Sequence, residues 1–189
     1  VSGLPLPLLP LQILWINIIT DVFPALALSV EPASGETMGQ RPRSPSEALF
    51  SPRFLFLICW QGLLLSAITL AAYVWALDAY GDGEHARTVA LLALVGVELG
   101  HSFNCRSRTR SAFNGFFANP YIFGAAMIMI ILQTAAFTIS PLSQLLDLVT
   151  PNFNDLMVTL MCVLTPVMIV ELTKVFARFR AGIRTQAKA

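Results

Sequence analysis

Five long apolar runs constrain this chain more than any other feature of its sequence. Each run is close to the roughly 20 residues that a helix needs to cross a bilayer. In the hydrocarbon core a backbone must satisfy its own hydrogen bonds, so an apolar run of this length is expected to form a helix. The expected spans are residues 11–30, 54–77, 88–105, 121–139 and 156–176. The sequence therefore predicts an all-α fold, a polytopic transmembrane bundle of five spans that forms one domain over residues 1–189.

The composition agrees with a membrane protein and excludes several other classes. Hydrophobic residues make up 56% of the chain and charged residues only 12%, against about 25% charged in soluble domains. The net charge of +1 gives no sign of nucleic-acid binding, so membrane lipid is the expected surrounding. The three cysteines lack the spacing of a metal site, and no phosphate-binding glycine loop or catalytic triad is visible.

The basic residues predict the orientation of the spans. Of the twelve Lys and Arg residues, three lie in residues 31–53, three in residues 106–120 and five at the C-terminal end, whereas only Arg87 lies on the other side. Basic residues concentrate on the cytoplasmic side of membrane proteins. We therefore expect a multi-pass protein of the plasma (inner) membrane with a cytoplasmic C-terminus. Residues 78–87 and 140–155 are expected to be loops on the outer side.

The first apolar run contains polar groups in a pattern that predicts a cation site. Asn17, Thr20 and Asp21 are spaced so that a helix places them on one face. An ionised side chain at this depth costs at least about 2.5–3.5 kcal/mol, so it requires a partner. Pro24 has no N–H to give to the Thr20 carbonyl, so the helix is expected to kink or unwind there. Amide, hydroxyl, carboxylate and carbonyl oxygens are ligands for small hard cations. The alternative is a buried structural acid beside an ordinary proline kink.

A second acid, Glu98, lies well inside the third run. If Glu98 faces Asp21 across the bundle, the two form a two-carboxylate cation site, and without a cation at least one of them must be protonated. The alternative is a hydrogen bond from Glu98 to a neighbouring helix. The metal ligands predicted from the sequence are thus Asn17, Thr20, Asp21 and Glu98, with no catalytic residue and no bound cofactor.

Several other residues are expected to have structural roles. Gly96 and Gly100 form a G-x-x-x-G pair that permits close helix contact. Glu171 and Lys174 are expected to form an ion pair, and His101 is expected to be hydrogen-bonded within the fold. Other expected interhelical hydrogen bonds involve Gln133 and Thr134.

The first run and its flanks resemble the sixth transmembrane helix of P-type cation-transporting ATPases, in the calcium-pump-like branch. The matching pattern is PxQxLWxNxxTDxxPAxALxxEP, which begins here at Pro10 and ends at Pro32. The segment MGQRPRSP, residues 38–45, resembles the cytoplasmic loop that follows this helix in the family. The pattern ExxxxxNxRS, from Glu98 to Ser107, resembles the eighth helix and its exit. The five runs then correspond to helices six to ten.

The resemblance implies an ATP-driven cation transporter in which Asn17, Thr20 and Asp21 bind the cation and Glu98 can join them. ATP and Mg²⁺ would act only in cytoplasmic domains that this sequence lacks, as it lacks the fourth helix. Those domains and helices are expected in the same chain or in a partner chain, so hydrolysis by this sequence alone is not predicted. Calcium is the first expectation. Because Val22-Phe23 and His101 replace residues usual in calcium pumps, sodium, potassium, magnesium, manganese and protons remain alternatives.

Two other classes of function compete with this interpretation. One is a stand-alone channel or secondary transporter, although the inverted repeats typical of such transporters are not visible. The other is a non-transporting membrane module that binds another membrane protein. The last two apolar runs fit the pump family mainly through their hydropathy.

Overall fold

The computed structural model describes residues 6–32, 51–106 and 116–186. In this part of the chain the elements are helical and no strand is present. They are α1 (Pro10–Thr20), α2 (Val22–Ser29), α3 (Pro52–Tyr80), α4 (Gly83–Cys105), the short 3₁₀ helix η2 (Phe116–Ala118), α5 (Pro120–Thr138), α6 (Ser140–Leu145) and α7 (Phe153–Gln186). The pair α1–α2, together with α3, α4, α5 and α7, gives five helical spans that are long and apolar enough to cross a membrane. The predicted all-α fold of five spans is confirmed.

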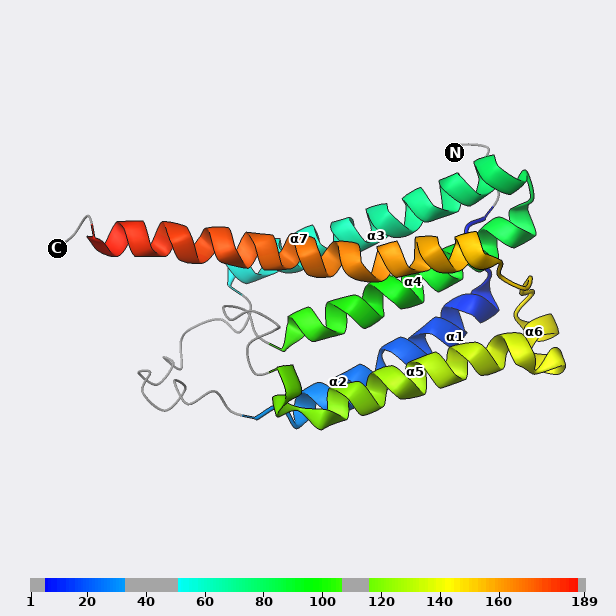
Figure 1. Cartoon of the computed structure of the whole chain (residues 1–189), viewed down its shortest axis with the longest axis horizontal. Helices are drawn as coiled ribbons and strands as arrows, with labels where there is room; N and C mark the ends of the chain where they lie inside the picture. Colours follow the sequence, from blue (N-terminus) through cyan, green and yellow to red (C-terminus); the bar gives the residue numbers. More distant parts are fainter. Residues whose placement is uncertain (1–5, 33–50, 107–115, 187–189) are drawn as a thin grey trace.

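Helix α4 is the centre of the bundle. The five spans run side by side, with α3 and α7 on one side of α4 and α1, α2 and α5 on the other (Figure 1). Within its most apolar window 67% of α4 is buried, against 33% for the α1–α2 span and 28% for α5. Alanines such as Ala76, Ala86, Ala90 and Ala93 form much of the core between α3 and α4, because small side chains let two helices approach closely.

The G-x-x-x-G pair fixes the contact between α4 and α7. A Cβ atom at Gly96 would lie 3.2 Å from a Val163 methyl, and one at Gly100 would collide with the Val163 backbone carbonyl. Since a backbone carbonyl cannot move aside as a flexible side chain can, only glycine fits at Gly100. The packing role predicted for this pair is confirmed.

The opposite side of α4 carries two smaller apolar clusters. Ile16 and Ile19 of α1 pack against α4 and against Met129 of α5. Ala27 of α2 packs against Ile122 and other residues of α5. Helix α5 therefore touches both halves of the first span.

Two segments expected to be loops are largely helical. Over residues 78–87, α3 runs to Tyr80 and α4 begins at Gly83, so only two residues connect them. Gly81 ends α3 in the left-handed conformation, with φ of 64°, and the Asp82 carboxylate accepts hydrogen bonds from the backbone N–H groups of Glu84 and His85. Gly81 therefore ends α3, and Asp82 caps the start of α4. The sequence becomes polar before α3 ends and is still polar where α4 begins, so the fall in hydropathy does not mark the helix ends.

The second such segment, residues 140–155, contains α6 and the start of α7. At its other end α7 continues past Phe176 to Gln186, beyond the apolar run. The α6 end of the bundle thus contains α6, the α3–α4 turn and the start of α7 (Figure 1). The opposite end, here called the Arg106 end, contains the end of α2, the end of α4 and the start of α5.

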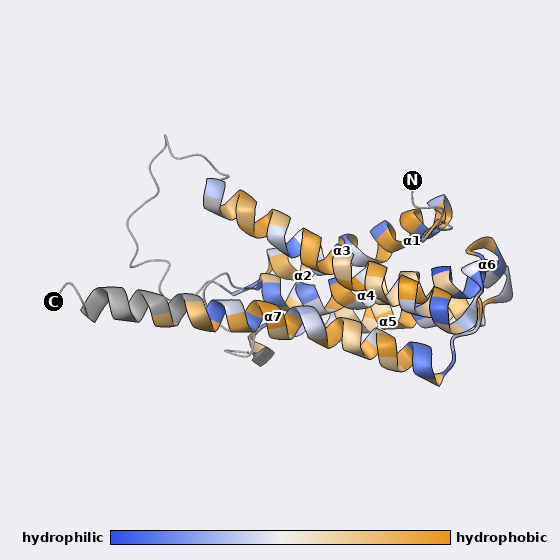
Figure 2. Cartoon of the chain, turned by 90° about the horizontal axis from the view of Figure 1, so that it is seen from above, coloured by the Kyte–Doolittle hydropathy of each residue, from blue (hydrophilic) through white to orange (hydrophobic). Residues whose placement is uncertain are grey.

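The outer surface of the described bundle is strongly apolar. Orange, hydrophobic residues cover the helices seen in Figure 2, and polar residues gather toward the two ends. Large exposed apolar side chains occur along the spans other than α4, including Leu26, Leu63, Ile131 and Met161. Such a surface suits contact with lipid or with further helices rather than with water.

Candidate cation site at a broken transmembrane helix

The first span is interrupted at Asp21, as the sequence predicts. Helix α1 ends at Thr20 and α2 begins at Val22, with Asp21 between them. The backbone bonds around the break are long, 3.3 Å from Asp21 N to Asn17 O and 3.4 Å from Ala25 N to Asp21 O. Pro24 cannot donate to the Thr20 carbonyl, which explains why the helix is interrupted one turn before it. A carboxylate and a carbonyl without its helical donor therefore lie together in the middle of the span.

The structure brings three of the four predicted ligands together. Thr20 is buried, its hydroxyl donates to the Ile16 carbonyl of its own helix at 3.0 Å, and the Glu98 carboxyl of α4 lies near both Thr20 and Asp21. One Glu98 oxygen, Oε2, is buried and has no hydrogen-bond partner among the described residues. Two acids and a threonine from two helices thus lie near one another.

Asn17 and Asp21 differ from the other two in their exposure. Both side chains lie on the exposed surface of the described bundle, one helical turn apart. The Asn17 side chain makes no hydrogen bond to Thr20, Asp21 or Glu98 within the described ranges. In the same part of the chain, no three His, Cys, Asp or Glu side chains are grouped as a complete metal site. The four predicted ligands are therefore divided in the described structure: Thr20 and Glu98 lie against the bundle, whereas Asn17 and Asp21 are on its exposed surface.

The neighbouring polar residues divide into those the sequence predicted correctly and those it did not. The Lys174 ammonium lies 3.1 Å from the Glu171 carboxylate, so the expected ion pair is present. Gln133 accepts an interhelical hydrogen bond from the Trp15 indole at 3.2 Å, as expected. The prediction for Thr134 was wrong, because its hydroxyl donates to the Ile130 carbonyl of its own helix. His101 was predicted to be hydrogen-bonded within the fold, but its Nδ1 atom is buried and has no hydrogen-bond partner among the described residues.

A clasp at the Arg106 end was not predicted from the sequence. Arg106 forms an ion pair with Glu31 at 2.9 Å, and the Asn119 amide donates to Glu31 at 2.6 Å and to the Ala27 carbonyl at 2.9 Å. Partial burial alone would raise the pKa of Glu31, but the hydrogen bonds from Arg106 and Asn119 and the charge of Arg106 lower it overall. The clasp joins the ends of α2 and α4 to the start of α5. Its sequence signal was the placement of Glu31 and Arg106 at the same end of adjacent spans.

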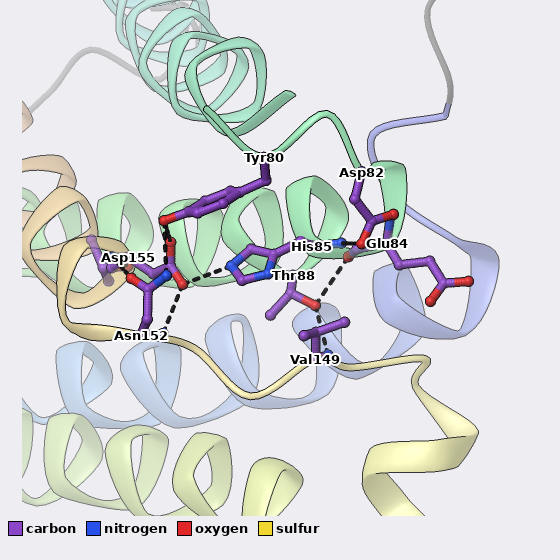
Figure 3. Close-up of polar contacts among 9 residues, drawn as sticks. Tyr80, Asp82, Glu84, His85, Thr88, Val149, Asn152 and Asp155 are labelled. Carbon is purple, nitrogen blue, oxygen red and sulfur yellow. Dashed lines mark hydrogen bonds and ion pairs between the residues drawn. The ribbon is translucent and has the colours of Figure 1, made fainter. Parts of the chain in front are cut away.

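A second unpredicted network lies at the α6 end (Figure 3). Asp155 is fully buried and accepts hydrogen bonds from the Tyr80 hydroxyl at 2.9 Å and from the Asn152 backbone N–H at 2.8 Å. The His85 ring nitrogen Nε2 lies 2.9 Å from the same carboxylate. The Asn152 side chain in turn accepts from Asp155 N and donates to Tyr80. One buried acid thereby ties the ends of α3, α4 and α7 together.

The fold and this site together define a class of protein. It is a polytopic helical membrane domain whose first span is broken around an acid and whose central helix supplies a second acid. Domains of this kind line ion pathways, because broken helices and intramembrane acids are otherwise costly in lipid.

Comparison with known proteins identifies the family. The family described as cation-transporting ATPase, C-terminus, matches residues 5–176, so the chain belongs to this family and is a C-terminal membrane domain of a P-type cation ATPase. Calcium-transporting ATPase 1 of Bacillus cereus is 34% identical over 91% of the chain, and the calcium-transporting ATPase of Bacillus subtilis is 33% identical over 84%. Calcium-transporting ATPase type 2C member 2 of Mus musculus is 27% identical over 97% of the chain.

The chain spans about a fifth of the length of these relatives, with matched shares of 21%, 18% and 20%. The loop motif at residues 38–45 and Ser107 lie outside the described residues, so the structure says nothing of those parts of the resemblance.

Proposed function

We propose that this chain, acting as one C-terminal transmembrane domain, supplies part of the cation-binding site of an ATP-driven cation pump, with calcium as the transported ion. The observation that carries the proposal is the break at Asp21, which places an exposed acid beside Thr20 and the Glu98 carboxyl of α4. The names of the similar proteins support the choice of calcium.

Each proposed ligand has a distinct role in this site. Asp21 and Glu98 supply negative charge, which a divalent cation requires when it leaves water for a membrane interior. Thr20 supplies its backbone carbonyl, which has no helical donor because Pro24 follows. Asn17 lies one turn from Asp21 and supplies a neutral amide oxygen on the same exposed side. Calcium takes six to eight oxygen ligands, so these groups alone are too few and other helices must complete the site.

The exposure of Asp21 supports this incomplete arrangement. An acid that faces hydrocarbon in the middle of a span is strongly unfavourable, whereas one that faces a cation or a polar cavity is not. We therefore propose that further helices of the same pump cover the exposed side of α1 and α2. ATP and Mg²⁺ act in cytoplasmic domains beyond this chain, and the C-terminus lies in the cytoplasm beneath the plasma membrane.

Substitution of the two acids in the full-length protein tests the proposal. We expect Asp21→Asn to abolish calcium-dependent phosphorylation by ATP, and Glu98→Gln to lower the apparent calcium affinity about tenfold, because each removes a charge from the coordination sphere. Radioactive calcium binding to purified protein measures the same loss without catalysis.

The matched control is Asp78→Asn, which removes an exposed acid near the end of α3, far from the break in sequence and structure. It should leave calcium binding unchanged. Normal calcium dependence in both Asp21→Asn and Glu98→Gln would overturn the assignment of the site. Calcium flux through the protein without ATP would instead favour a channel.

A further inference from the structure

Hydrogen bonds to α5 and to the α6 segment that follows it hold both ends of the broken span. Toward the α6 end, the Trp15 indole of α1 donates to Gln133 of α5, and the buried Gln12 amide donates to the Leu146 carbonyl at 2.9 Å. Toward the Arg106 end, Asn119 donates to the Ala27 carbonyl of α2 and to Glu31. These contacts come from opposite ends of α5, because Asn119 is its N-cap and Gln133 lies in its last turns.

The middle of the span is held differently. Within the described part of the chain, no hydrogen bond joins residues 16–26 to α5. The Thr20 hydroxyl donates to the Ile16 carbonyl of its own helix at 3.0 Å, and Glu98 of α4 lies close to Thr20. The backbone bonds on either side of Asp21 are long. The half-helices α1 and α2 are thus fixed at their outer ends, while the break between them has the weakest backbone support.

We infer that α5 is a splint that fixes the spacing and direction of α1 and α2, and that Gln133 and Asn119 are positioning residues for the ligands at the break. A continuous α-helix carries its own hydrogen-bond ladder across every turn, which keeps its two ends in register. The first span lacks this continuity at Asp21, so the register must come from a neighbour. Helix α5 has an unbroken 19-residue ladder and contacts both halves.

The splint explains why buried amide groups occur along an otherwise apolar helix. Asn119 is fully buried and Gln133 is 8% exposed. The Asn119 oxygen caps α5 by accepting from Tyr121 N, and its amide nitrogen bridges to α2. Asn119 therefore uses its amide nitrogen between α5 and α2, and Gln133 uses its amide oxygen between α5 and α1, while Gln133 Nε2 is buried without a partner among the described residues. Neither residue reaches a proposed cation ligand directly. Their effect on cation binding must pass through the geometry of α1 and α2.

The anchoring hydrogen bonds are tested in the full-length protein with variants that each change one of the residues forming them. Trp15→Phe and Gln133→Leu each remove the hydrogen bond between α1 and α5. Asn119→Ser removes the hydrogen bonds from Asn119 to Ala27 and Glu31 and keeps a good N-cap for α5. These three are the anchor variants. Each single variant should raise the calcium concentration for half-maximal phosphorylation by about threefold to tenfold, the effect expected from the loss of one or two hydrogen bonds. The double variant of Trp15 and Gln133 should be no worse than the poorer single variant, because both changes remove the same bond.

A distance measurement separates positioning from a general loss of stability. Spin labels at Leu11 and Val30, both exposed, lie across the break and are separated by about 28 Å along the helix axis at 1.5 Å per residue. Pulsed electron paramagnetic resonance should give a narrow distance distribution in the parent protein and a broader one in each anchor variant. The matched control is Thr134→Val on α5, which removes only a bond to its own helix and should leave the distribution narrow.

Two results would overturn the inference. One is a distance distribution that stays narrow in all three anchor variants. The other is broadening in Thr134→Val as large as that in Gln133→Leu. The importance of Gln133 and Asn119 for calcium rests on the proposed function, whereas the distance measurement does not. Broadening together with normal calcium dependence in Asp21→Asn would therefore reject the cation site and support the splint.

Discussion

The two sides of α4 are built in different ways. The group α3–α4–α7 is held by close packing of small residues, with alanines between α3 and α4 and glycines between α4 and α7. The group α1–α2–α5–α6 has smaller apolar clusters and depends on hydrogen bonds at its ends. Its first span is broken, whereas the described spans α3, α4, α5 and α7 are each a single helix.

This difference matches what each side is proposed to do. A tightly packed group resists movement, because closely packed interiors transmit strain and leave no room for rearrangement. A span that binds and releases an ion must change its local geometry, so a break supported at its two ends is suited to that role. The bundle therefore joins a rigid group to an adaptable one through α4, which carries Glu98.

The largest expected effect on stability concerns the buried acid of the rigid group. Asp155→Ala should destabilise the protein by about 3 kcal/mol, because the hydroxyl of Tyr80, the ring of His85 and the N–H of Asn152 lose their shared partner. Thermal unfolding of the purified protein in lipid or detergent measures the loss.

The control for this prediction is Asp82→Asn at the neighbouring helix start. Asparagine caps a helix about as well as aspartate, so this variant should unfold within about 0.5 kcal/mol of the parent. If Asp155→Ala unfolds at the same temperature as the parent, the network at the α6 end does not hold the three helices together.

A pair of glycine substitutions compares the two groups directly. Gly100→Ala should cost about 1–3 kcal/mol, because its Cβ meets the Val163 backbone between α4 and α7. Gly124→Ala on α5 meets no atom within 4 Å and should be neutral or stabilise the helix by up to about 1 kcal/mol. Unfolding of both variants under one set of conditions gives the comparison.

Equal effects of the two glycine substitutions would contradict the distinction between a tightly packed and a loosely packed group. A loss of stability in Gly124→Ala alone would reverse this distinction, and would show that α5 packs against its neighbours more closely than α7 does.

The smallest expected effect concerns the clasp that joins the two groups. The pKa of Glu31 is below its ordinary value of 4.5, so its ion pair stabilises the fold fully above that value, and the contribution is lost as the pH falls through the lower folded pKa. Glu31→Gln should therefore lower Tm at neutral pH, and its difference from the parent should shrink as the pH falls below 4.5.

Measurement of Tm for the parent and for Glu31→Gln across this pH range checks both the sign and the size of the change in their Tm difference. A difference that grows toward acid pH would contradict the lowered pKa. A constant difference would indicate that packing or the Asn119 hydrogen bond, rather than the charge of Glu31, stabilises the clasp.

Much of the architecture could be predicted because it depends on local patterns. Hydropathy over about 20 residues identified the five spans, since a bilayer sets the length that a helix must cover. The interruption near Asp21 followed from Pro24, because proline removes a defined donor. The contact role of Gly96 and Gly100 followed from their spacing on one helix face. In contrast, the polar composition of residues 78–87 predicts a loop, whereas only Gly81 and Asp82 connect α3 to α4.

The sequence by itself determined which polar groups the first and third spans carry at the candidate site: two acids, a threonine and an amide. Only the tertiary structure decided which of these groups meet. It brought Glu98 near Thr20 and Asp21, buried Asp155 in contact with Tyr80, His85 and Asn152, and joined Glu31 to Arg106 and Asn119. These contacts join residues far apart in the chain, and their geometry depends on how helices rotate and cross, which a one-dimensional pattern does not contain.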